Sequence, residues 1–248
     1  MATITETGHA KNAANFDVLI TCALGYGAGY KPSKASLAIP ALQIQSASAH
    51  AALRAVNASL PAYNNAVAIR SEAFAPLNPL LTRVFNALKA TDASEQIIDT
   101  ARALVRKLQG VRATPKMTEK EKAALPEGEK APKEISSSQL SFDNRLDNFD
   151  KLIQLLGSIP FYAPNERELQ LPALTSMYDE MVAKNTDVVA ATVPLYNARI
   201  TRNQVLYAPG TGLVDTAADV KSYVKSVFGA GSSQFKQVSI LKFKSEPS

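Results

Sequence analysis

The sequence has no tryptophan, a single cysteine and only two histidines, His9 and His50. One cysteine, Cys22, cannot form a disulfide within the chain and cannot build a cysteine-based metal site. Aromatic residues make up only 7% of the 248 residues, whereas the hydrophobic fraction is 46%. Alanine, leucine and valine therefore supply the apolar surface, and these side chains favour close packing of helices.

Long hydrophobic runs are also missing. No uninterrupted apolar run reaches the ~18 residues that a transmembrane helix needs. Residues 1–11 are polar and rich in threonine, and they lack the apolar core of a secretory signal. A cytoplasmic, soluble protein is predicted.

Four short sequence blocks occur twice, in the same order and 132 or 133 residues apart. The matched blocks are 15–20 with 148–153, 30–42 with 162–174, 61–64 with 194–197, and 74–76 with 207–209. Each block carries features in register, including prolines at 32/164, 40/172, 61/194 and 76/209. Proline is costly inside helices, so its recurrence indicates a shared backbone. The pattern predicts a tandem duplication.

The duplication divides the chain into two repeats with a connection. The predicted segments are a flexible N-terminus (1–11), repeat 1 (12–112), a charged mobile linker (113–140), repeat 2 (141–244) and a frayed tail (245–248). The linker is rich in Lys, Glu and Pro and has almost no large apolar side chains.

The apolar spacing predicts an all-α fold, an elongated helical bundle with pseudo-twofold symmetry. The predicted helices cover 11–24, 34–75 and 93–110 in repeat 1, and 141–158, 166–208, 213–228 and 233–243 in repeat 2. The long helices contain Pro61 and Pro194, which predict a kink or a break in each. We expect them to pack in antiparallel contact.

Helix ends are marked by capping residues. Ser33 and Asn165 are predicted N-caps of the long helices, and Asp92 with Glu95 is a predicted capping box. Gly110 follows the helix over 93–110 as its predicted C-terminal cap.

Catalytic and metal signatures are weak. Glu6 and His9 have the spacing of one half of a di-iron motif, but such sites need two motifs and further carboxylates. Asp143, Asp147 and Asp150 share one face of a helix, where a hard cation could bind, but a solvated face opposite the apolar residues explains them better. No serine or threonine has a supporting His–Asp arrangement. No catalytic residue, cofactor or metal site is predicted.

Positive charge is concentrated in repeat 1. Residues 12–112 hold ten Lys/Arg and five Asp/Glu, whereas residues 141–248 hold eleven of each. Four cations, Arg102, Arg106, Lys107 and Arg112, gather near the end of the helix over 93–110. They either complement the helix dipole or form a small patch for an anion or an acidic partner.

Residues 82–88 and 141–150 resemble segments of bacterial all-helical proteins of unknown function. This resemblance implies no activity, cofactor or partner.

Together these features predict a non-enzymatic structural or protein-interaction protein whose partner is itself, as a homo-oligomer, or another protein. No small-molecule substrate is predicted. The alternative is a module that binds nucleic acid or an anionic membrane surface through the basic first repeat. A third hypothesis is a metal-dependent enzyme that uses the aspartate face.

Overall fold

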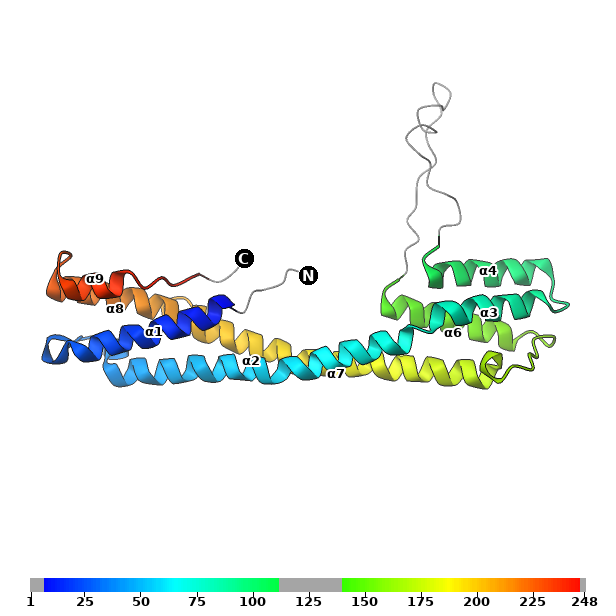
Figure 1. Cartoon of the computed structure of the whole chain (residues 1–248), viewed down its shortest axis with the longest axis horizontal. Coiled ribbons are helices and arrows are strands. Elements are labelled where there is room, and N and C mark those ends of the chain that lie inside the picture. The colour runs from blue at the N-terminus through cyan, green and yellow to red at the C-terminus, as the bar shows by residue number, and fades with distance from the viewer. Residues whose placement is uncertain (1–6, 112–139, 246–248) are drawn as a thin grey trace, which may run out of the picture. The chain divides into compact units, whose positions relative to one another are not determined.

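The computed structural model describes residues 7–111 and 140–245, and within these ranges it contains helices and turns but no strand (Figure 1). The α-helices are α1 (Thr7–Gly25), α2 (Ile39–Phe74), α3 (Leu77–Lys89), α4 (Glu95–Gln109), α6 (Phe142–Gly157), α7 (Leu171–Tyr207), α8 (Leu213–Phe228) and α9 (Ser233–Ser239). The all-helical prediction is confirmed. Every helix in the described ranges is too short or too polar to serve as a membrane span.

The chain divides into two compact units. Unit 1 comprises residues 1–64 and 190–248, and unit 2 comprises residues 65–189. Each unit therefore combines helices from both predicted repeats, because a repeat in sequence and a compact unit in space are different divisions. The repeat boundaries stay a prediction. The linker over 113–140 lies outside the described residues except for its last residue.

Unit 1 brings the beginning and the end of the described chain together. Helix α1 packs against α8 and α9, which Figure 1 shows in blue, orange and red. The core of unit 1 combines α1 and the start of α2 with the end of α7, α8 and α9. Its largest fully buried side chains include Phe16, Leu19 and Leu42. Burial of this apolar surface holds the unit together.

Unit 2 has a core of its own. Helix α4 packs against both α3 and α6, and all three are drawn in green in Figure 1. The buried side chains include Phe149, Leu152 and Leu156 of α6 and the apolar face of α3. Ile98 of α4 and Phe149 of α6 are 8% and 0% exposed.

The two cores use the same sequence positions. The matched buried residues are Phe16/Phe149, Leu19/Leu152, Ile20/Ile153, Leu37/Leu169 and Leu42/Leu174, separated by 132 or 133 positions. Buried residues of α3 and α8 match at a separation of 136, as Leu77/Leu213, Leu81/Ala217, Val84/Val220 and Leu88/Val224. Three additional residues before α8 account for the larger separation.

A buried tyrosine closes an equivalent turn in each unit. The hydroxyl of Tyr30 donates to the carbonyl of Leu37 at 2.8 Å, and that of Tyr162 donates to the carbonyl of Leu169 at 2.9 Å. Burial raises the pKa of each tyrosine to about 12. Each hydroxyl satisfies a buried acceptor and fixes the turn ahead of a long helix.

The long helices begin later than predicted. A 3-10 turn, η2 (Ala35–Leu37) or η3 (Arg167–Leu169), comes before each one, and Ser33 and Asn165 are not its caps. Pro40 and Pro172 explain the later start, since a helix from 34 or 166 would lose the hydrogen bond that a proline nitrogen cannot donate. In the first helical turn that missing donor costs nothing.

Helix α4 confirms one predicted end and corrects the other. Gly110 adopts the left-handed conformation at the C-terminus, with φ of 70°, as predicted. The N-cap is Ser94 rather than Asp92, so the predicted capping box with Glu95 is wrong. Helix α3 was not predicted, and α1 begins at Thr7, within the segment expected to be flexible.

The segment after α9 is extended and lies along α1. The predicted helix over 233–243 ends at Ser239. Beyond it, Asn12 donates to the carbonyl of Lys244 at 2.9 Å and accepts from its backbone nitrogen at 2.9 Å, while Asn15 donates to the carbonyl of Lys242 at 2.7 Å. Two side-chain amides of α1 therefore hydrogen-bond to the backbone of this segment.

Candidate functional site

The predicted basic patch lies at the end of α4 in unit 2. Arg102 forms ion pairs with Asp99 and, at 3.6 Å, with Glu95 on its own helix. Arg106 and Lys107 stand in the last turn, where cations interact favourably with the helix dipole. Arg112 lies outside the described residues. The charge of Arg102 is thus compensated locally, and an anion-binding role for the patch stays a prediction.

The aspartate face of α6 is engaged by other side chains. Asp143 accepts from Asn185 at 2.8 Å, Asp147 pairs with Lys151 at 2.6 Å, and Asp150 accepts from Gln154 at 3.2 Å. Within residues 7–111 and 140–245, no three acidic, histidine or cysteine side chains are arranged to hold a metal ion. The three carboxylates are spread along the helix, each with its own partner.

His9 is a core residue of unit 1. Its side chain is 1% exposed, and its Nδ1 lies 2.6 Å from the hydroxyl of Tyr207. Asn12 donates to the same hydroxyl at 3.3 Å. The prediction of a flexible N-terminus over residues 1–11 is therefore wrong for His9. Glu6 lies outside the described residues.

His50 also has a partner, in a cluster that the sequence did not predict. Its Nε2 lies 2.7 Å from Oδ2 of Asp17, and the hydroxyl of Ser46 donates to Oδ1 of the same carboxylate. Ser46 and His50 are four residues apart, so they share the face of α2 that meets α1. Their four-residue spacing was visible in the sequence, but nothing in the sequence placed Asp17 opposite them.

The order of groups in this cluster decides what it can do. In a hydrolytic triad the imidazole stands between the carboxylate and the hydroxyl, so that it can take the hydroxyl proton. Here the carboxylate of Asp17 stands between the hydroxyl of Ser46 and the imidazole of His50. The arrangement ties α1 to α2 and does not activate Ser46 as a nucleophile.

A pocket of about 690 Å³ opens in unit 2 beside α3. Its walls come from the end of α3 and from the segment that leads into η3. Polar lining residues include Arg83, Asp92 and Glu166, and the exposed ring of Phe161 stands at its edge. This volume is within the range of small-molecule sites.

The equivalent place in unit 1 is filled by aromatic rings. Tyr223 packs edge-on against Tyr30 with ring centroids 5.2 Å apart, and its hydroxyl accepts from the backbone nitrogen of Lys31 at 3.0 Å. At the separation of 136, the residue of α3 that corresponds to Tyr223 is Ala87. Ala87 lines the pocket of unit 2, whereas unit 1 has the ring of Tyr223 at that position.

An apolar row lies exposed on the part of α7 that belongs to unit 1. Val193, Tyr196 and Ile200 are 53%, 63% and 42% exposed, and their spacing of three and four places them on one face. A second pocket, of about 380 Å³, continues the row and is lined by Ile200, Tyr207 and Pro209 among others. Exposed apolar side chains in a contiguous row are typical of a contact surface.

The buried side of the same helix has residues at steps of seven. Leu174, Met181, Val188, Leu195 and Arg202 are all buried. Arg202 donates to Oδ1 of Asn203 from Nε at 3.0 Å and from a terminal nitrogen at 2.7 Å.

Comparisons with models of protein families, with curated proteins and with solved structures found no match to this chain.

Proposed function

We propose that this chain is a non-enzymatic interaction protein that associates with a second copy of itself through the apolar row of α7. The observation that carries the proposal is the exposure of Val193, Tyr196 and Ile200 on one helical face. Burying such side chains against a partner is favourable in proportion to the apolar area removed from water.

The charge around the row supports a second copy as the partner. From Val188 to Ala198 the chain has no Asp, Glu, Lys or Arg. A twofold contact brings the same surface of both subunits together, so a charged residue near its axis would lie close to the identical charge of the partner subunit. The stretch around Val193 and Tyr196 carries no charge and avoids that repulsion, and Arg199 follows at its end, next to Ile200.

The proposal of a non-enzymatic role rests on the arrangement around Asp17. Its carboxylate accepts a hydrogen bond from the hydroxyl of Ser46 and faces His50 on the other side, which is the wrong order for nucleophilic catalysis. The carboxylates of α6 are held apart by separate partners.

The tandem duplication is part of the same proposal. It is supported by the two tyrosine–carbonyl turns, by the matched buried residues, and by Pro61 and Pro194 inside the two long helices. Two helices of nearly equal length with an interior proline at the same place are expected if one ancestral unit was copied.

Light scattering across a concentration series tests the self-association. The parent chain should gain mass with concentration, and Tyr196→Glu should shift it to the monomer because two acquired charges would face each other. Thr201→Glu adds the same charge to an exposed position on another face of α7 and should leave the association unchanged. A parent that stays monomeric at all concentrations, or equal effects of both variants, would contradict the proposal.

A further inference from the structure

Both units join helices of one proposed repeat to helices of the other. Turn η2 packs on α8 in unit 1, and η3 packs on α3 in unit 2. The contacts join equivalent elements of the two units but use different side chains. We infer that these side chains form matched pairs, each with one member in repeat 1 and one in repeat 2. Because of these pairs, each repeat packs well against the other repeat and poorly against a second copy of itself. This inference rests on the proposed duplication.

The first matched pair is a hydrogen-bonded contact in one unit and an apolar contact in the other. His9 meets Tyr207 in unit 1 with a hydrogen bond of 2.6 Å. The residues 133 positions away are Phe142 and Phe74, which meet edge-to-face in unit 2 with centroids 4.8 Å apart. If a repeat paired with its own kind, His9 would face Phe74 and the hydroxyl of Tyr207 would face Phe142. Each mismatch takes a buried polar atom away from its partner.

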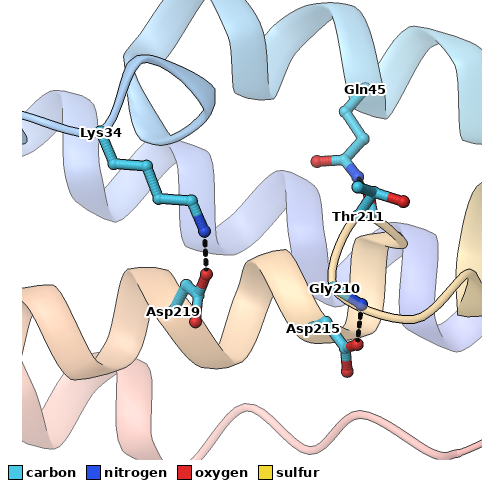
Figure 2. A network of polar contacts seen from close by, with 6 residues as sticks. All are labelled: Lys34, Gln45, Gly210, Thr211, Asp215 and Asp219. Carbon is cyan, nitrogen blue, oxygen red and sulfur yellow. Dashed lines mark hydrogen bonds and ion pairs between the residues drawn. The ribbon is translucent and has the colours of Figure 1, made fainter.

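The second matched pair reverses its charges between the units. Figure 2 shows the ammonium of Lys34, at the start of η2, against Asp219 of α8, 2.6 Å apart. In unit 2, Glu168 of η3 pairs with Arg83 of α3 at 2.5 Å, and Arg83 holds the position that corresponds to Asp219. The residue that corresponds to Lys34 is Glu166, so Glu168 contacts the same position of α3 from two residues further along the turn. Pairing of like repeats would set Lys34 against Arg83 and Glu168 against Asp219. Both contacts would be repulsive.

The third matched pair is steric. The ring of Phe228 lies so close to Gly29 that a Cβ there would sit 3.0 Å from it. The residues at the corresponding positions in unit 2 are Phe161 and Asp92, which line the same pocket. A repeat 2 that paired with its own kind would bring Phe161 onto Phe228, and the two rings would compete for one space.

These three pairs give the chain a rule for assembly. The surface that each repeat presents takes the other repeat as its partner. An identical repeat would lose a hydrogen bond and bring two like charges together, and two copies of repeat 2 would also meet a steric conflict. Self-association of the whole protein must then use a different face, such as the apolar row of α7.

Two double-mutant cycles on the full chain test the inference, with the melting temperature as readout. Lys34→Glu and Asp219→Arg each create the charge mismatch of a like pairing, and the double variant restores opposite charges in the order found in unit 2. His9→Phe and Tyr207→Phe each set a phenylalanine against a polar side chain, which is the mismatch that like pairing would give the first pair. Their double variant reproduces the two phenylalanines of unit 2. Each charge mismatch should lower the melting temperature by about 2–4 °C, and each double variant should melt above both of its singles.

Lys11→Glu, an exposed charge reversal on α1, is the control and should not respond to Asp219→Arg. Purely additive effects in both cycles would overturn the inference, as would single mismatches that melt with the parent. The cycles report the fit within unit 1, and light scattering of the Tyr196→Glu variant reports self-association. Failure of either proposal can therefore be told from failure of the other.

Discussion

Unit 1 and unit 2 have equivalent cores that are filled differently. Where unit 2 buries Leu156 and Met181, unit 1 has Ala23 and Ala49 at the corresponding positions. Unit 1 makes up for the smaller aliphatic side chains with aromatic contacts, including the pair of Tyr26 and Phe228 with centroids 5.3 Å apart. Unit 2 has larger aliphatic side chains in its core, and it has a pocket at the place where unit 1 has aromatic rings.

This difference indicates that the backbone is specified by a few shared positions. The matched phenylalanines of α1 and α6 and the turn tyrosines are the same in both units, whereas the surrounding side chains vary in size, charge and polarity. Close-packed interiors tolerate such exchanges when total volume is kept. The surfaces of the units differ as well: unit 2 has the pocket beside α3, and unit 1 has the apolar row of α7.

The largest expected effects come from the shared positions. Phe16 and Phe149 are both fully buried, so replacement of either ring by alanine removes its contacts and leaves a cavity. We expect Phe16→Ala and Phe149→Ala each to lower the free energy of unfolding by about 3–5 kcal/mol. Urea denaturation followed by circular dichroism measures both. Unequal losses, with one variant near the parent, would contradict the equivalence of the two cores.

A smaller and one-sided effect is expected where the units differ. Tyr223→Ala removes the ring that packs on Tyr30 and the acceptor of the Lys31 nitrogen, and should cost about 1–3 kcal/mol. Ala87→Tyr, the reverse exchange in unit 2, adds a ring to a pocket of about 690 Å³ and should change stability by less than about 1 kcal/mol. The same unfolding experiment compares them. A severe loss from Ala87→Tyr would show that the pocket cannot accept the ring.

Much of the fold could be predicted from local patterns. The spacing of apolar residues gave the helices over 93–110 and 213–228 within two residues of their observed ends, because amphipathic periodicity is a local property. Gly110 could also be identified as a helix end from the sequence, because the preference for glycine at this position is local as well. Helix α3 was missed because Pro76 and Pro79 at its start look like a loop, although both lie where a helix needs no donor.

The clusters of side chains could not be predicted in the same way. His9 and Tyr207 are 198 positions apart, and Asp17 and His50 are 33 apart, so only the tertiary packing brings them together. The division into units was also hidden, since each unit mixes helices from both predicted repeats. A sequence period identifies which segments are alike, but not which of them touch.

The pH dependence of stability should be shared by both units. Burial raises the folded pKa of Tyr30 and Tyr162 to about 12, above the ordinary value of 10.0. The neutral hydroxyl is therefore favoured by folding, so this stabilisation is complete below pH 10 and is lost as the pH rises through 12. Urea midpoints at rising pH should fall more steeply for the parent than for a Tyr30→Phe/Tyr162→Phe variant. Equal slopes would show that the turn tyrosines titrate normally.

The smallest effect on stability is expected at the basic patch, which also decides the alternative function. Arg102 is held by Asp99 and Glu95, whereas Arg106 is exposed in the last turn of α4. If the patch binds nucleic acid or an anionic membrane, Arg106→Glu should weaken that binding more than Arg102→Gln does, because the charge of Arg102 is already compensated. Each variant should change the free energy of unfolding by no more than about 1 kcal/mol, as is usual for surface ion pairs and helix-end charges. Binding to duplex DNA and to phosphatidylserine vesicles at low salt provides the measurement. If the parent chain binds neither DNA nor the vesicles, the alternative function is rejected. If the Arg106→Glu variant still binds tightly, the binding surface lies elsewhere on the chain.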